Sequence, residues 1–398
     1  MLGVRGDPES ARFINRSLVL GSMKSGEVLS RAELARQLRL SKVTISQVVA
    51  DLISEGLVEE TGDGGTSSTG GRRPRLIRVV SSGPYVIGLD IGLTNTVVAL
   101  AGLDGTRIEQ FREPTDVKHD AGSILAQIET LTEAILAKRN VPRTMILGVG
   151  ISIGGLIDGG TGYIAFSPDF GWEELPFRGM VEQRLGLPTI LDNCTRAMAL
   201  GENWHEKSYD TRNIFYVNVG HGIGSAIVMH GRIYNNNSEF GHIRITNRDV
   251  LCDCGKRGCL EAVASGHAIE KLAAAAQDAQ VSAARSAKEV AMLASAGNAT
   301  ALGIFRDASR YLGRALSIAA TLFNPDRVVI AGGVASARHL LEEPLMDEYT
   351  ATTMDVIKNS TVVTFSSYGM DAGINGAICL ALDRFVFHGE AAIVANST

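Results

Sequence analysis

The sequence predicts an α/β protein with two lobes, preceded by a small winged helix-turn-helix head. Three observations lead to this prediction. Two helix signals and two strand signals follow one another within residues 1–80, a strand–glycine turn–strand pattern occurs once in each half of the remaining chain, and helical stretches follow each copy. A length of 398 residues with 45% hydrophobic residues allows two or three domains with separate cores.

Charge is distributed unevenly along the chain. Residues 1–80 contain 12 Lys and Arg against 9 Asp and Glu, whereas the whole chain has a formal net charge of −5. A slightly basic front end before an acidic body is expected when only a small part of a protein touches a polyanion. No stretch reaches the roughly 18 apolar residues of a membrane span. The first ten residues lack the apolar core of a signal peptide, so a cytoplasmic protein is expected.

Two helix starts lie close together near the N-terminus. Ser30 and Glu33 have the spacing of a capping box, and Ser41 precedes a second stretch in which apolar residues recur every three or four positions. Gly56 is expected to end that second helix. Two helices joined by a turn of three or four residues predict a helix-turn-helix, whose second helix reads the major groove. The side chains expected to face the DNA are Lys42, Val43, Ser46 and Gln47.

The segment that follows predicts a wing. Residues 57–61 and 75–79 read as two strands joined by a glycine-rich loop at residues 62–71. Arg72 and Arg73 stand at the base of this loop, and arginines in a mobile arm can enter a narrow minor groove. We therefore predict that residues 1–80 bind a double-stranded DNA operator. The alternative is a head that makes protein contacts while its arginines are solvated.

The body contains a repeated hairpin pattern. Residues 86–92 and 96–100 form one copy, and residues 214–220 and 225–229 form the other, which suggests a duplicated lobe. Glycines at strand ends bring backbone N–H groups close to a phosphate, although tight hairpin turns alone also explain them. Further helices are predicted at residues 123–138, 283–296 and 301–322, and a strand at 327–331. The expected domains are residues 1–80, 85–193 and 194–374, with residues 375–398 returning to the first lobe.

Three of the five cysteines crowd into one loop, at Cys252, Cys254 and Cys259. So few cysteines cannot form a disulfide framework, and their close spacing in a reducing compartment indicates a metal. Together with His242 they make a closed tetrahedral ligand set, which is typical of structural zinc. Gly255 and Gly258 would let the loop fold tightly around the ion. The alternative is three buried, reduced thiols.

Two glutamates flank this loop. Glu239 precedes His242 by three residues, and Glu261 follows Cys259 by two. Carboxylates accept hydrogen bonds from paired sugar hydroxyls, and a metal loop would hold both carboxylates rigidly. The pair therefore suggests a sugar site, while the alternative is that both glutamates are surface charges.

The chain resembles the ROK family (repressors, open reading frames and sugar kinases) over nearly its whole length. The resemblance rests on Gly-Ile-Ser-Ile-Gly-Gly at residues 150–155 with Asp158, Glu-Phe-Gly-His at 239–242, the cysteine segment at 252–261, and residues 324–326 with 331–333. It implies a two-lobed, actin-like ATPase fold. It also implies a sugar site that comprises Gly155, Asn193, Glu239, His242 and Glu261. A winged-helix head in front of the sugar-kinase body marks the family's transcriptional regulators.

Two departures from the family's kinases favour a regulator. The kinases carry an Asp-x-Gly-Gly-Thr-Lys phosphate loop, and here Leu93 replaces its second glycine and Asn95 its lysine. In the kinases an aspartate after the asparagine of the Leu-Asp-Asn segment takes the sugar hydroxyl's proton. Here that position is Cys194, a poor base, and the neighbouring Asp192 would point elsewhere on an extended segment.

These features together predict a protein without catalytic residues. We expect a DNA-binding repressor of carbohydrate-use genes whose body contains structural zinc and responds to a sugar or sugar phosphate. Reading paired half-sites implies a homodimer or a dimer of dimers. The alternative is an ATP-dependent ROK sugar kinase. A zinc-dependent scaffold without a ligand would leave Glu239 and Glu261 without a role.

Overall fold

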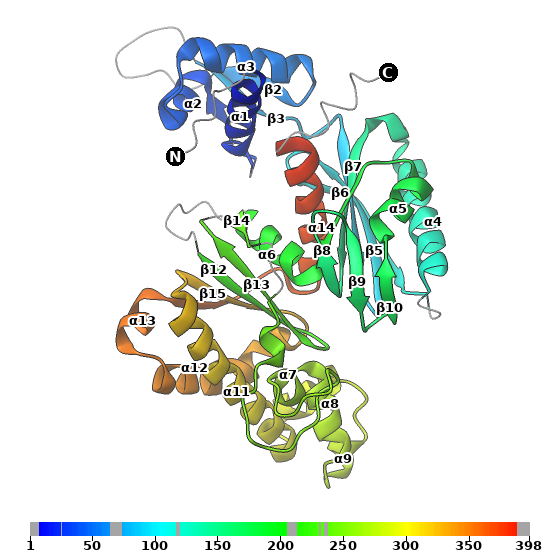
Figure 1. Ribbon diagram of the computed structural model, residues 1–398, viewed down its shortest axis with the longest axis vertical. Coiled ribbons are helices and arrows are strands. Elements are labelled where there is room, and N and C mark those ends of the chain that lie inside the picture. Colours follow the sequence, from blue (N-terminus) through cyan, green and yellow to red (C-terminus); the bar gives the residue numbers. More distant parts are fainter. Residues whose placement is uncertain are drawn as a thin grey trace. The chain divides into compact units, whose positions relative to one another are not determined.

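The computed structural model describes residues 8–24, 26–63, 74–116, 120–204, 213–230, 232–234 and 238–387 (Figure 1). Two compact units make up the chain: unit 1 is Met1–Ala197 with Ile374–Thr398, and unit 2 is Met198–Gly373. Among the described residues, every helix is too short or too polar to cross a membrane.

The N-terminal part of unit 1 combines three helices with a three-stranded antiparallel sheet of order β1-β3-β2. Its elements are α1 (Pro8–Gly21), β1 (Leu29–Ser30), α2 (Arg31–Leu38), α3 (Lys42–Ser54), β2 (Val58–Asp63) and β3 (Arg75–Val79). The capping box at Ser30 is confirmed, because Glu33 N donates to Ser30 Oγ at 3.2 Å and Ser30 N donates to Glu33 Oε2 at 2.8 Å. Ser41 caps α3 by accepting from Thr44 N at 3.0 Å.

Helix α1 is absent from the sequence-based prediction, yet it supplies part of the core of this region. Val19 and Leu20 of α1 are fully buried, as are residues of α2, α3 and β3. The fully buried side chains from those elements are Leu34, Ile45, Val49, Leu52 and Ile77. An α1 residue, Arg12, also forms an ion pair with Asp51 of α3 at 2.8 Å. The helix pair is therefore completed by a third helix that packs across it.

The rest of unit 1 is built on a five-stranded sheet of order β11-β7-β4-β5-β6. The central hairpin β4–β5 is antiparallel, whereas β7 and β11 run parallel to β4. The strands are β4 (Tyr85–Ile91), β5 (Asn95–Gly102), β6 (Arg107–Pro114), β7 (Ile146–Ile153) and β11 (Thr189–Asn193). A smaller sheet contains β8 (Leu156–Asp158), β9 (Tyr163–Ser167) and β10 (Trp172–Leu175).

Helices cover both faces of the larger sheet. On one face, α4 (Ala121–Arg139) and α5 (Phe177–Leu185) pack on the apolar side chains of β4, β7 and β11. On the other face lies α14 (Ala372–Leu382), which continues into a π-helical turn, η5 (Asp383–Phe387). It approaches so closely that a Cβ at Gly150 would collide with the carbonyl oxygen of Ala377. The C-terminal helix therefore packs on glycine positions of the sheet.

Unit 2 repeats this topology, which confirms the repeated hairpin. Its sheet has the order β14-β13-β12-β15-β16, with an antiparallel β12–β13 hairpin and with β15 and β16 parallel to β12. The strands are β12 (Ile214–Val219), β13 (Ile223–Met229), β14 (Arg232–Ile233), β15 (Arg327–Ala331) and β16 (Val362–Phe365). Helix α6 (Cys194–Trp204) spans the boundary between the two units along the chain. Its residues pack on β12, β13 and β15, on the sheet face opposite the main core of unit 2.

The main core of unit 2 lies between this sheet and a helical layer. The helices are α7 (Glu261–Ala264), α8 (Gly266–Ala274), α9 (Ala279–Ser282), α10 (Ala287–Ser295), α11 (Ala299–Phe323), α12 (Arg338–Thr352) and α13 (Asp355–Ser360). Short 3₁₀ turns lie at η2 (Phe240–His242), η3 (Val334–Ala337) and η4 (Gly369–Asp371), and η1 (Arg143–Met145) lies in unit 1. The helix predicted over 283–296 begins later than expected, because Ser286 caps α10 by accepting from Glu289 N.

Candidate functional site

Four soft donors come together in unit 2: His242, Cys252, Cys254 and Cys259. One donor atom of each lies within 4.8 Å of those of the other three. Cys252 Sγ is 3.7 Å from His242 Nδ1, and Cys254 Sγ is 3.7 Å from Cys259 Sγ. Two thiolates on one tetrahedral zinc ion lie about 3.8 Å apart, given Zn–S bonds near 2.3 Å, whereas a disulfide requires about 2.05 Å. The arrangement therefore fits a shared metal ion.

The loop that presents the thiols depends on two glycines. Gly255 and Gly258 have φ values of 80° and 78°, in the left-handed region. A Cβ at Gly258 would also collide with the carbonyl oxygen of Thr246. Cys252 N donates to Lys256 O at 2.8 Å, which closes the turn. Burial raises the pKa of the Cys252 thiol to about 12, so a bound metal would have to displace its proton.

The Glu-Phe-Gly-His segment is anchored by its two middle residues. The Phe240 ring packs edge-on against Phe215, with ring centroids 5.0 Å apart. A Cβ at Gly241 would collide with the carbonyl oxygen of Ile223. This packing places Glu239 and His242 on either side of the anchor, where Glu239 Oε2 lies 3.8 Å from His242 Nε2. The imidazole thus has one nitrogen toward the thiols and the other toward a carboxylate.

Glu261 lies beside the same imidazole. Its Oε2 accepts a hydrogen bond from Ile223 N at 2.8 Å, and its Oε1 is 3.9 Å from His242 Nδ1. Gly222 leaves room for it, because a Cβ there would collide with Oε2. The three unit 2 residues predicted to bind sugar are therefore gathered at the start of β13. Glu261 is mostly buried, whereas Glu239 is exposed.

The other two residues of the predicted sugar site, Gly155 and Asn193, lie in unit 1 and contact each other. Asn193 Nδ2 donates to Gly155 O at 2.8 Å, and its Oδ1 accepts from Thr195 N at 2.9 Å. Gly155 has a φ of 136°. Asn193 therefore holds the backbone of Gly155, and its amide retains one further N–H for a ligand.

Position 194 supplies no base for proton removal. Burial, together with the nearby charge of Asp90, raises the pKa of the Cys194 thiol to about 12, so the thiol is protonated at neutral pH. The neighbouring Asp192 carboxylate is already engaged. Strand β11 pairs with β7 in unbroken register through Asn193, and Arg196 binds the Asp192 carboxylate, with Nε 2.7 Å from Oδ1.

The residues predicted to face DNA are exposed on α3. Lys42, Ser46 and Gln47 are all exposed, and Val43 is 80% exposed. Gln47 Nε2 donates to Asp51 Oδ1 at 3.1 Å, which orients its amide along the helix. The predicted minor-groove arginines, Arg72 and Arg73, lie outside the described residues.

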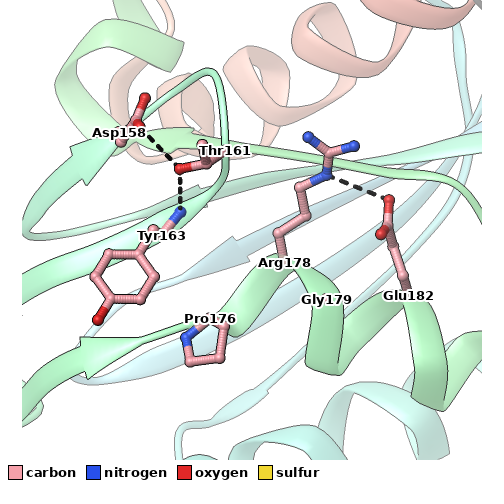
Figure 2. Close-up of a pocket in the computed structure, with 7 residues that line it drawn as sticks. All are labelled: Asp158, Thr161, Tyr163, Pro176, Arg178, Gly179 and Glu182. Atoms are coloured by element: carbon pink, nitrogen blue, oxygen red, sulfur yellow. Dashed lines mark hydrogen bonds and ion pairs between the residues drawn. The ribbon is translucent and has the colours of Figure 1, made fainter.

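A separate pocket lies in unit 1, beside the β8–β9 turn and α5 (Figure 2). Its volume is about 460 Å³, and it contains none of the predicted site residues. Its polar side chains pair with one another: Thr161 Oγ1 donates to Asp158 Oδ2 at 2.8 Å, and Arg178 Nε donates to Glu182 Oε1 at 3.2 Å. Sequence reasoning did not single out this pocket, and its internally paired groups point to no ligand.

Two units that repeat one sheet topology, with a His/Cys loop between two glutamates in the second, define a sugar-kinase-like α/β protein. The ROK family model matches residues 86–384, and the chain belongs to the ROK family. The xylose repressor of Bacillus subtilis is 27% identical, with 96% of this chain and 98% of that protein covered.

Solved structures with the same fold include both regulators and kinases. A ROK family transcriptional regulator, described as a homologue of Escherichia coli MLC, has a TM-score of 0.82 at 24% identity and covers 96% of this chain and 98% of its own. A ROK glucokinase from Streptomyces griseus, solved with glucose and AMPPNP, has a TM-score of 0.66 at 26% identity, with 75% and 99% covered.

Proposed function

We propose that this ROK protein is a sugar-responsive transcriptional repressor. The observation that carries the proposal is the N-terminal region of helices and hairpin, which precedes the ROK body and exposes a polar face of α3. The similarity to the Bacillus subtilis xylose repressor extends over 96% of the chain and so includes this region. A family kinase such as the Streptomyces griseus glucokinase matches only 75% of the chain.

In this proposal the N-terminal region is a winged helix-turn-helix. Helices α2 and α3 form the helix pair, with Arg39 in the left-handed conformation at the turn between them. Strands β2 and β3 form the wing, and Arg72 and Arg73 shortly precede β3 in the sequence. Lys42 and Ser46 would contact bases or phosphates, Gln47 would pair with a base edge, and Val43 suits a thymine methyl group. A dimer would read two half-sites of a double-stranded operator.

Two classes of DNA contact are expected to respond differently to mutation. Gln47→Ala should change the preferred operator sequence, because it removes an amide that reads a base edge. The double change Arg72→Ala and Arg73→Ala should weaken binding to all sequences and reduce the salt slope by about 1 to 2, because phosphate contacts are lost. Binding is measured against a selected operator at several salt concentrations, with the exposed Arg285→Ala as control. Unchanged affinity, preference and salt slope in both variants would exclude this surface.

We further propose that the His/Cys loop holds one structural zinc ion through His242, Cys252, Cys254 and Cys259. The donor spacing supports this assignment, and a closed set of four protein ligands leaves no open position for catalysis. When bound, zinc would crosslink the loop to the Glu239–His242 segment. The ion would then keep both flanking glutamates in place.

The sugar is proposed to bind in unit 2 to Glu239, Glu261 and the Nε2 edge of His242. Asn193 and the backbone of Gly155, in unit 1, stay predicted sugar-binding residues. The carboxylates of Glu239 and Glu261, one on either side of the His/Cys loop in the sequence, can accept hydrogen bonds from neighbouring sugar hydroxyls. His242 Nε2 lies 3.8 Å from Glu239 Oε2. A thermal-shift screen of monosaccharides and their phosphates identifies the ligand, because selective binding stabilises the folded state by mass action. The proposal fails if an identified sugar leaves operator affinity unchanged.

Sugar affinity is expected to depend on both glutamates. Glu239→Gln and Glu261→Gln should each weaken binding by about tenfold or more, because a lost charged acceptor costs roughly 1–3 kcal/mol. Calorimetry with the identified sugar measures the effect, and Glu343→Gln, an exposed glutamate on α12, is the control. Operator affinity without sugar should remain normal. Unaltered sugar binding in both variants would place the sugar site elsewhere.

A sugar kinase is the second candidate, favoured by the ROK glucokinase match. Cys194 and the altered phosphate loop favour the repressor. At that loop, Gly92 N donates to Asn95 O at 3.0 Å in a tight turn, and the Asn95 amide donates to Thr94 Oγ1 at 2.9 Å. An amide cannot supply the charge of the kinase lysine.

A further inference from the structure

A second group of metal-ligating side chains lies in unit 2, outside the His/Cys loop. His221, His267 and Glu270 each offer a donor atom within 4.8 Å of the other two. His221 stands in the turn between β12 and β13, and the other two lie in the first turns of α8. No sequence motif indicated a role for any of them.

Backbone hydrogen bonds fix the two histidines relative to each other. Gly266 N donates to Gly220 O at 2.8 Å, and His267 N donates to His221 O at 3.1 Å. Gly266 permits this approach, because a Cβ there would lie 2.7 Å from Gly220 O. The two imidazole rings lie beside each other, with centroids 4.7 Å apart and planes tilted by 36°. The start of α8 is therefore attached to the hairpin turn before any ligand binds.

Carboxylates surround the imidazole of His267. Glu270 Oε2 is 3.9 Å from its Nδ1, and Asp253 Oδ2 is 3.6 Å from its Nε2. Glu270 is oriented by the hydrogen bond from Ala287 N to its Oε1, at 3.0 Å. Two features oppose a cation here: Lys271 Nζ, which lies 3.1 Å from Asp253 Oδ1, and the positive end of α8. The two carboxylates offset that positive charge.

We propose that His221, His267 and Glu270 form a second divalent-metal site. Two imidazoles and one carboxylate suit zinc, cobalt or nickel rather than magnesium or calcium. Three protein ligands leave a coordination position for water, unlike the closed His/Cys set. Zn–N bonds of 2.0–2.1 Å place donors about 3.3 Å apart, so the partly exposed side chains must rotate inward on binding. This site is therefore weaker than the thiolate site.

The turn that carries His221 connects this site to Glu261. Ile223, two residues further on, donates its backbone N–H to Glu261 Oε2. A metal ion bound by both the turn and α8 would therefore stabilise the hydrogen bond that positions Glu261. This consequence for Glu261 rests on the proposed sugar site, whereas metal binding itself does not.

Metal stoichiometry tests the site directly. The full chain, without a histidine tag and with its tight metal retained, is titrated with Zn²⁺ by calorimetry, and bound metal is then counted by elemental analysis. The wild type should bind one further equivalent. His267→Ala and Glu270→Gln should bind it at least about tenfold more weakly, while keeping the tight metal. His230→Asn is the matched control, because His230 is exposed, lies outside the cluster and has a φ of 53° that asparagine tolerates.

Each outcome decides the proposal. No further equivalent in the wild type, or an unchanged further equivalent in His267→Ala, would overturn it. If His267→Ala proves unfolded by circular dichroism, His221→Ala, which alters an exposed side chain, gives the same readout. Operator and sugar binding are measured on the same variants, so that the second metal site and the proposed repressor function are tested separately. Loss of the second metal with normal operator binding supports the metal site alone.

Discussion

Cys254→Ala is expected to remove the zinc ion proposed for the His/Cys loop and to lower the unfolding midpoint of the body by roughly 10 °C. The Cys254 side chain is exposed, so its loss leaves no cavity in the core. The destabilisation therefore comes from the lost ligand. Structural zinc contributes about 10–16 kcal/mol in small peptides that need it to fold. A unit with its own core should lose less, about 3 kcal/mol, and each kcal/mol shifts the midpoint by about 2–4 °C.

Elemental analysis and thermal unfolding measure the two effects on protein purified without added zinc. The wild type should retain about one tightly held equivalent after dialysis against a weak chelator. Cys194→Ser, which alters a cysteine of unit 1, is the control and should keep its metal. A wild-type protein that is well folded and free of metal would contradict the zinc assignment, because the four donors would then be reduced side chains packed together.

The wild-type protein is expected to release no ADP above background with any sugar. A positioned base contributes about 10² to 10⁴ to the rate of such a reaction. Here the thiol of Cys194 stays protonated, because its pKa is raised to about 12. The phosphate loop, with Leu93 and Asn95, also lacks groups that position the nucleotide, on which phosphoryl transfer largely depends. Both losses act on the same reaction, so their effects combine.

A coupled assay with a broad sugar panel and saturating magnesium ATP tests this expectation. Asp192→Asn serves as the comparison, because it removes the negative charge while keeping the side-chain shape beside Arg196. Turnover near 1 s⁻¹, within the ordinary enzyme range, that disappears in Asp192→Asn would make the protein a kinase that uses the neighbouring carboxylate. No turnover from a protein that binds its sugar normally supports the repressor.

Short-range signals in the sequence determined much of this protein. The caps at Ser30 and Ser41 specify where α2 and α3 begin, because each hydroxyl satisfies an N–H within three residues of itself. The cysteine loop could be recognised for a similar reason: its three cysteines and its two glycines lie within eight residues. The repeated hairpins could also be predicted from the sequence, because the two strands and the turn of each hairpin are continuous in the chain.

Only the tertiary structure decided the features that join distant residues. Nothing near Gly150 in the sequence indicates that α14 packs against it, more than 200 residues later. His221 and His267 are brought together by hydrogen bonds between a turn and a helix start. Local patterns report the energetics of neighbouring residues, whereas these contacts form only when separate elements pack against one another.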